Sequence, residues 1–186
     1  ALAAARAHQT ESESIELKQL TEQLTASQEE LRVRANHDEL TGLPNRRYVR
    51  ELVDGIIAGK DPNNELALVF VDIDHFKRVN DFYGHHVGDS LLKGVADRIC
   101  GQIRSSDVAG RISGDEFVIV LDPVKERLDA LTIVEQIRDK LREPFEIEGF
   151  TIKTSASIGV ALFPLHGPDY ETLRYNADTS MYHAKT

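Results

Sequence analysis

Residues 66–73 read Leu-Ala-Leu-Val-Phe-Val-Asp-Ile, an apolar run typical of a buried strand that is interrupted by one acid, Asp72. A second acidic pair, Asp115-Glu116, stands directly before the strand-like run 117–121. A buried carboxylate without a partner costs several kcal/mol, and a divalent cation is a partner that acids at neighbouring strand ends can share. Hard cations prefer oxygen ligands, so we interpret Asp72 and Asp115 as metal ligands. A nearby lysine and several glycines indicate that this cation carries phosphates.

The hydrophobic periodicity predicts strand, helix, strand, strand, helix and strand in that order. We expect strands at 65–73, 107–112, 116–121 and 154–163, helices at 44–58, 87–103, 125–142 and 169–184, a short helix near 74 and a small hairpin at 145–153. This order is the α+β, ferredoxin-like βαββαβ arrangement, with helices on both faces of the sheet and a long helix before it. Its right-handed crossover leaves a gap that the third strand fills antiparallel. The hairpin turn at 113–115 then lies beside Asp72, and Asp74 is expected to cap the short helix.

The 186-residue chain has a formal net charge of −9, which argues against a general nucleic-acid or membrane binder. Its single cysteine, Cys100, allows no internal disulfide and fits a reducing compartment. The sequence contains neither a membrane-span pattern nor a signal-peptide pattern. It begins without Met and stops after a helical pattern. We therefore expect a cytoplasmic piece of a longer protein, in which an upstream sensor domain and any membrane anchor lie outside this sequence.

The N-terminal segment is expected to be a separate helix. Residues 10–36 are polar and lack Gly and Pro, and Leu17, Leu24 and Leu31 are spaced by seven, with Leu20 three beyond Leu17. This narrow stripe predicts a coiled-coil seam that pairs two chains as a homodimer. The alternative is a solitary solvated helix, or one that packs on its own domain. We divide the chain into a signalling helix, 1–36, and a globular domain, 37–186.

The globular part resembles the GGDEF family, the diguanylate cyclases. The resemblance runs from about Asp38 to Lys185 through ordered motifs: Asp38-Glu-Leu-Thr-Gly-Leu-Pro-Asn-Arg46, Asp72-Ile-Asp-His-Phe-Lys-Arg-Val-Asn-Asp81, Gly84-His85, Gly88-Asp89, Gly114-Asp-Glu-Phe117, Ser157-Ile-Gly159 and Ala177-Asp178. It implies a palm-like fold and a cyclase domain at 37–186. It also implies condensation of two GTP into cyclic di-GMP, with release of pyrophosphate, between two facing domains.

The resemblance implies metal binding by Asp72, Asp115 and the backbone carbonyl of Ile73, with Mg²⁺ or Mn²⁺ as the cofactor. Glu116 matches an acid that binds a second metal or helps to deprotonate the attacking hydroxyl. The plainer alternatives are a strand-end acid that caps the next helix for Asp72, and ordinary turn chemistry for Asp115.

Phosphate contacts are expected at the start of the short helix. Free backbone amides from 74 to 77 form an anion site, and Lys77 adds a full charge; the alternative for Lys77 is a solvated helix lysine. The resemblance assigns further substrate contacts to Phe76, Gly114 and Lys185. The arginine that usually follows this last lysine in the family is not in the chain.

Asn80 and Asp89 are expected to read the base. Guanine presents N1–H and N2–H₂ side by side, and one carboxylate can accept both. Adenine lacks this donor pair, so a site built this way rejects ATP. The alternative for Asp89 is a capping acid at the start of the 87–103 helix, and the two roles are compatible.

Ser113 stands where the family has its first signature glycine. We expect this position to require a positive φ, which costs serine on the order of 1 kcal/mol, and we expect its side chain to crowd the substrate and slow catalysis. Turnover should be retained, because Gly114, Asp115 and Glu116 remain. The alternative function is a catalytically silent module that binds GTP or cyclic di-GMP. A third interpretation, a dimerising connector, predicts no nucleotide binding.

Arg104 and Asp107 match the family's Arg-x-x-Asp inhibitory product site at the expected offset from the signature. An arginine fork grips phosphate or guanine acceptors, and Asp107 can accept guanine donors. The alternative is a surface ion pair of little energetic value. Gln136 takes the place of a supporting family arginine, so we expect mild product inhibition.

Overall fold

The computed structural model describes the backbone of residues 2–59, 61 and 64–185, and the side chains of residues 17–59, 61 and 64–182. The chain forms two compact units, Ala1–His37 and Asp38–Thr186, and each is treated by itself. Within the described residues, no helix is both long enough and apolar enough to cross a membrane.

The first unit is one helix, α1 (Leu2–Asn36). The four leucines of the predicted stripe lie on its surface: Leu17 is 66% exposed, Leu20 61%, Leu24 58% and Leu31 63%. The ion pairs of Arg32 with Glu29 and of Arg34 with Glu30 are local contacts along this helix. A leucine stripe of this kind is buried only when a further surface covers it.

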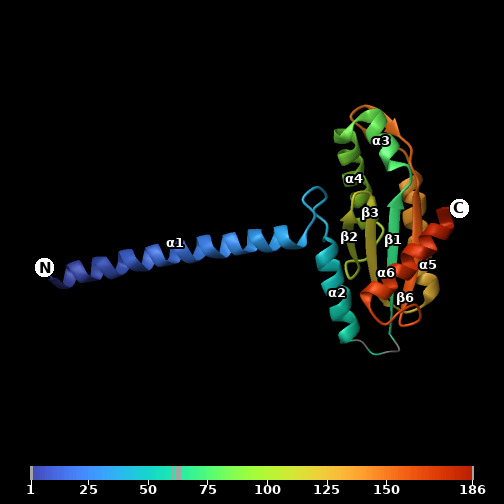
Figure 1. The fold of residues 1–186 in the computed structure, drawn as a ribbon. Helices are drawn as coiled ribbons and strands as arrows, with labels where there is room; N and C mark the ends of the chain where they lie inside the picture. Colours follow the sequence, from blue (N-terminus) through green and yellow to red (C-terminus); the bar gives the residue numbers. More distant parts are fainter. Residues whose placement is uncertain (1, 60, 62–63, 186) are drawn as a thin grey trace. The chain divides into compact units, whose positions relative to one another are not determined.

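The second unit is built on a four-stranded antiparallel sheet in the order β2-β3-β1-β6 (Figure 1). The strands are β1 (Glu65–Ile73), β2 (Val108–Ser113), β3 (Glu116–Val124) and β6 (Ala156–Phe163). The third strand in the chain fills the gap between the first two, so the predicted ferredoxin-like sheet is confirmed.

Helices cover both faces of this sheet. They are α2 (Arg46–Ala58), α3 (Phe76–Tyr83), α4 (His85–Cys100), α5 (Arg127–Arg142) and α6 (Tyr170–Lys185), and a hairpin of β4 (Phe145–Ile147) and β5 (Phe150–Ile152) stands apart from the sheet. Alternate β1 side chains, such as Val69 and Val71, pack with α4 and α5 in one core. The intervening residues, such as Leu68 and Phe70, pack with α2 and α6 in the other. The strand period of two therefore gives the central strand two buried faces.

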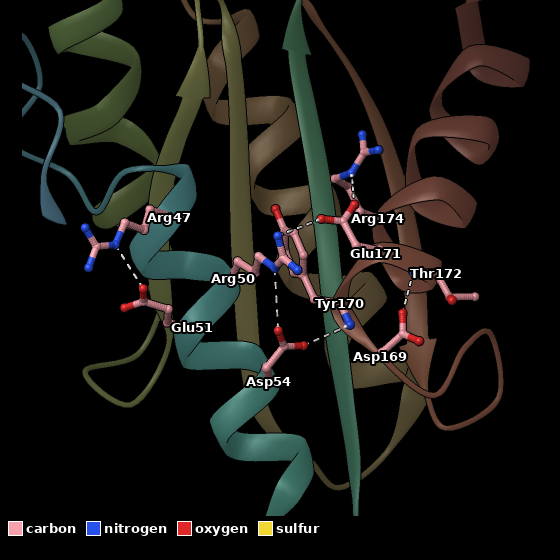
Figure 2. A network of polar contacts seen from close by, with 9 residues as sticks. All are labelled: Arg47, Arg50, Glu51, Asp54, Asp169, Tyr170, Glu171, Thr172 and Arg174. Atoms are coloured by element: carbon pink, nitrogen blue, oxygen red, sulfur yellow. Dashed lines mark hydrogen bonds and ion pairs between the residues drawn. The ribbon is translucent and has the colours of Figure 1, made fainter. Parts of the chain in front are cut away.

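A polar network joins α2 to the start of α6 (Figure 2). The Asp54 carboxylate accepts the backbone N–H of Tyr170 at 3.3 Å, which satisfies one of the open amides at the α6 N-terminus. The guanidinium of Arg50 lies 3.8 Å from Asp54 and 3.7 Å from Glu171. The ring of Tyr170 is 1% exposed, and its burial raises the pKa of the phenol. These contacts tie α6 to α2 at one end of the sheet. The turn at 113–115, called the signature turn below, lies at the opposite end.

The packing of α6 on β6 requires glycine at position 159. A Cβ at Gly159 would fall 2.0 Å from the Ala177 carbonyl oxygen and 2.5 Å from the Met181 nitrogen. Both atoms are helix backbone, so α6 itself would have to move.

We therefore expect Gly159→Ala to lower the free energy of unfolding by at least about 2 kcal/mol, as overpacking does. Gly55→Ala is the matched control, because nothing lies within 4 Å of its Cβ position on α2. The control should stabilise the protein by about 0.5–1 kcal/mol. Urea unfolding of both variants measures the difference, and equal stability of the two would contradict the close approach of α6 to β6.

Candidate active site

Four polar residues form a row across one end of the sheet, one from each strand. Ser113 pairs with Glu116, Glu116 with Asp72, and Asp72 with Ser157. Residues that pair directly in an antiparallel sheet project from the same face. The next same-face residues along β1 and β3, Phe70 and Val118, belong to the core under α2 and α6, so the row continues that face beyond its apolar part.

The structure brings together the acids that were predicted to meet. Asp72 lies opposite Glu116, and the Ile73 N–H donates to the Asp115 carbonyl at 3.3 Å. The carboxylate-bearing residues Asp72 and Glu116 are half-buried, as is Asp115. Three acids and the Ile73 carbonyl therefore lie within two adjacent strand ends.

Oxygen donors of this kind suit a magnesium ion that also binds a substrate. Among the residues with described side chains, no group of three or more His, Cys, Asp or Glu is placed so that it could hold a metal ion. Mg²⁺ usually keeps several waters and takes one or two carboxylates plus substrate phosphates, so a partial set of oxygen donors fits it.

The signature turn differs from our expectation at Ser113. The positive φ of 46° falls on Gly114, whereas Ser113 ends β2 and has no positive φ. The predicted backbone strain at Ser113 is therefore wrong, because the glycine that remains makes the turn. The Ser113 hydroxyl instead donates to Glu116 Oε2 at 2.6 Å.

An arginine–aspartate contact that the sequence did not reveal supports this turn. The Arg111 guanidinium donates to both carboxylate oxygens of Asp38 at 2.9 and 3.1 Å. It also donates to the Gly114 carbonyl from Nε at 2.9 Å and from Nη2 at 2.8 Å. Thr41 donates its backbone N–H and its hydroxyl to the same carboxylate at 2.9 and 2.7 Å. One guanidinium thus ties the segment after residue 37 to the turn that precedes Asp115.

Asp74 does not cap the short helix, which corrects our expectation. Its carboxylate accepts from the hydroxyls of Ser155 at 2.5 Å and Ser157 at 2.7 Å, and its N–H donates to the Ser155 carbonyl at 2.9 Å. The position before α3 is taken by His75, with a φ of 58° and no side-chain cap bond. Because β6 pairs with β1, Ser155 and Ser157 lie close enough to Asp74 to bind its carboxylate, which therefore does not bind the amides of α3. The residues between β1 and α3 are thereby anchored to the start of β6, and the Asp74 amide is not free for an anion as predicted. The Lys77 side chain is exposed in the first turn of α3.

The proposed base-reading residues lie on the helix pair α3 and α4. A Cβ on Gly88 would fall 1.9 Å from Asn80 Oδ1 and 3.3 Å from the Phe76 ring, so the glycine permits this approach. Asn80 Oδ1 is buried and has no hydrogen-bond partner within the described part of the chain. An amide oxygen is an acceptor, so a donor from a ligand would satisfy it. Asp89, one residue after Gly88, is exposed.

Arg104 and Asp107 form a turn whose acid belongs to the fold. Asp107 is 9% exposed, and its carboxylate accepts the backbone N–H of Arg104 at 2.9 Å and of Asp122 at 3.3 Å. The contact between the pair thus runs through the Arg104 backbone, while the Arg104 side chain is exposed. Gln136 is exposed on α5. The product site stays a prediction, and its accessible part is the guanidinium of Arg104.

Two further observations limit the site. The side chain of Lys185 lies outside the described residues. A cavity of about 720 Å³ borders α3, and its lining includes His75, Arg78, Phe82 and Lys153. Its lining includes Asp74 and His75 from the segment between β1 and α3, but none of the acids in the row and neither Asn80 nor Asp89.

Residues 35–186 match the family described as diguanylate cyclase, GGDEF domain. The chain belongs to this family, as its motifs predicted. Among curated relatives, it is 42% identical over 168 residues to the bifunctional diguanylate cyclase/cyclic di-GMP phosphodiesterase MucR of Pseudomonas aeruginosa, covering 89% of this chain and 24% of MucR. It is 40% identical over 153 residues to the diguanylate cyclase TpbB of the same species, covering 81% of this chain and 35% of TpbB. The chain therefore spans about a quarter to a third of the length of these relatives.

Solved structures show the same fold. The GGDEF domain of TpbB superposes with a TM-score of 0.77 at 40% identity, covering 80% of this chain and 88% of that one. The coiled coil and GGDEF domain of DgcB from Caulobacter crescentus, in complex with c-di-GMP, gives a TM-score of 0.84 at 26% identity, covering 94% and 93%. The predicted α+β fold with a preceding helix is confirmed.

The Arg111–Asp38 contact generates a pH-dependent prediction. Burial alone would raise the pKa of Asp38, but hydrogen bonds from Thr41 and Arg111 outweigh it and hold the pKa below its usual value. A carboxyl with a lowered folded-state pKa stabilises the protein above its unfolded pKa of about 3.9, and this contribution disappears as the pH falls through the folded value.

We therefore expect Asp38→Asn to lower the free energy of unfolding by about 2 kcal/mol at pH 7, since it removes charge-assisted hydrogen bonds. The difference from wild type should shrink as the pH falls below about 4. Glu51→Gln, which breaks the exposed pair with Arg47, is the control and should cost less than about 0.5 kcal/mol. Urea titrations from pH 7 to pH 3 test this, and a pH-independent difference would refute it.

Proposed function

We propose that this domain condenses two molecules of GTP into cyclic di-GMP with release of two pyrophosphates. The observation that carries the proposal is the placement of Asp72, Asp115 and Glu116 at adjacent strand ends in a chain of the GGDEF family. In each half-reaction a 3′-hydroxyl attacks the α-phosphate of the other GTP. The new P–O bond forms as the bond to pyrophosphate breaks, and the hydroxyl proton leaves to a base.

Asp72, Asp115 and the Ile73 carbonyl would hold the metal, and Glu116 would either hold a second ion or accept the hydroxyl proton. Bound Mg²⁺ or Mn²⁺ supplies charge neutralisation to the attacking and leaving oxygens. The chain itself contributes positioning, since the half-buried acids project from a sheet that cannot shift easily.

Most of the proposed substrate contacts come from residues in the segment that runs from β1 through α3 to α4. Lys77 and the first amides of α3 would bind phosphate oxygens, with Gly114 and Lys185 nearby in the family arrangement. Asn80 Oδ1, buried without a partner within the described residues, would accept a guanine donor, and Asp89 would accept the others. Phe76 would pack beside the base, because its ring lies next to Gly88.

Two domains must meet, because each holds one GTP. We propose that the exposed leucine stripe of α1 pairs two chains as a homodimer and so raises the local concentration of the half-sites. Cyclic di-GMP would bind at Arg104 and slow turnover, and the exposed Gln136 offers no second guanidinium to strengthen this binding.

The rival is a silent module that binds GTP or cyclic di-GMP. Relatives named as phosphodiesterases also carry the matching region, among them PdeR of Escherichia coli at 42% identity over 167 residues. The geometry of the turn favours turnover here, since Ser113 introduces no positive φ and leaves Gly114 to make the turn.

The proposal predicts that the purified chain forms cyclic di-GMP from GTP only with Mg²⁺ or Mn²⁺. Asp115→Asn should lower turnover at least 100-fold, because the neutral amide is a poor metal ligand, while the thermal midpoint stays near wild type. Asp139→Asn, an exposed acid on α5, is the control and should turn over normally. A chromatographic assay measures the cyclic di-GMP formed by each protein. Full activity of Asp115→Asn would refute the assignment of Asp115 as a metal ligand.

The homodimer proposal predicts a dependence on protein concentration. In Leu24→Ser/Leu31→Ser, specific activity should fall more steeply on dilution than in wild type, because the paired stripe is lost. Glu22→Ser/Glu29→Ser changes the same helix outside the stripe and should follow wild type. Sedimentation measured alongside activity should show fewer dimers only in the leucine variant. Identical dilution curves for all three proteins would count against the stripe.

A further inference from the structure

Ser113 carries a side chain at a place where the resemblance to the family implies none. It pairs with Glu116 across the β2–β3 ladder, directly after an irregularity between Arg111 and Ser113. The distance from Ser113 Oγ to Glu116 Oε2 is 2.6 Å. This length is typical of a hydroxyl that donates to an ionised carboxylate.

We propose that Ser113 is a positioning residue for the cyclase reaction, because its hydroxyl fixes the orientation of the Glu116 carboxylate. The inference rests on the function proposed above. Ser113 touches neither substrate nor metal in this role and acts through Glu116.

The neighbours of Glu116 explain why its orientation needs support. Glu116 and Asp72 lie directly opposite each other, and like charges in that relation repel. A long glutamate side chain at a half-buried strand end has several rotamers available. The hydroxyl of Ser113 draws Oε2 towards β2, away from the side of β3 that pairs with Asp72, and leaves Oε1 as the oxygen for a ligand or a proton.

The turn holds the serine where it can do this. Gly114 takes the positive φ of 46°, so Ser113 stays in strand geometry. The Arg111 guanidinium holds the Gly114 carbonyl with two hydrogen bonds of 2.9 and 2.8 Å. The residue after the serine is therefore held in place, and the short serine side chain reaches Glu116.

The test uses the full chain and the variants Ser113→Ala, Ser113→Thr, Glu116→Ala and Ser113→Ala/Glu116→Ala. The first readout is Mn²⁺ affinity, followed by electron paramagnetic resonance, in the presence of a non-hydrolysable GTP analogue. The second is kcat and KM for GTP at saturating Mg²⁺. Thermal midpoints confirm folding, which is expected because Ser113 is exposed.

We expect Ser113→Ala to weaken Mn²⁺ binding at least threefold and to lower kcat by a similar factor with little change in KM. Ser113→Thr keeps a hydroxyl and should stay within twofold of wild type in both readouts. In the Glu116→Ala background, removing the serine should change Mn²⁺ affinity no further, because the hydroxyl has lost its acceptor.

Three outcomes overturn the inference: Ser113→Ala matches wild type in both readouts, removing the serine weakens Mn²⁺ binding equally with and without Glu116, or the wild-type protein binds no Mn²⁺. Wild-type protein that makes no cyclic di-GMP refutes the proposed function instead, and the Mn²⁺ titrations still decide whether Ser113 acts through Glu116.

Discussion

The antiparallel pairing of β1 with β3 at the centre of the sheet is the constraint on which the site depends. It places Asp72 opposite Glu116 and the Ile73 amide on the Asp115 carbonyl, although these residues are far apart in the chain. Both strands are buried on two faces, so a register slip of one residue would move apolar side chains into the site and acids into the core. The positions of the acids are therefore held by burial of the strands that carry them.

Close backbone approach allows the surrounding elements to hold these strands. Glycine occurs where a helix or segment comes nearest: Gly159 under α6, Gly88 against Asn80, and Gly110 beside Val49 and the Pro44 carbonyl. At Gly110 a Cβ would lie 2.5 Å from the Val49 side chain, which brings the start of α2 onto the outer strand β2. Interiors are packed densely, so each missing side chain leaves room for a close contact with the neighbouring helix or segment: main chain at Gly159, side chains at Gly88, and both at Gly110.

Local patterns predicted the strands, the helices and the meeting of the acids, because hydrophobic period and chain handedness decide those features. The family resemblance assigned roles to them. Patterns did not predict which polar side chains pair across the fold. Asp74 looked like a helix cap, and only the position of β6 shows that Ser155 and Ser157 take its carboxylate. Asp38 and Arg111 carry no local signal that they meet, since an ion pair between distant residues follows from topology and rotamers.

Ser113 shows how such a contact changes the meaning of a substitution. From the sequence alone, serine in place of the family's glycine predicted backbone strain at the turn. In three dimensions the positive φ belongs to Gly114, which adopts it freely, so the backbone tolerates a side chain at Ser113, and that side chain reaches Glu116. The Arg111 guanidinium binds the Gly114 carbonyl in the turn, and the Ser113 hydroxyl binds the carboxylate of Glu116 after the turn. Because the two contacts use different atoms of the hairpin, the turn can lose a glycine and still present its acids beside Asp72.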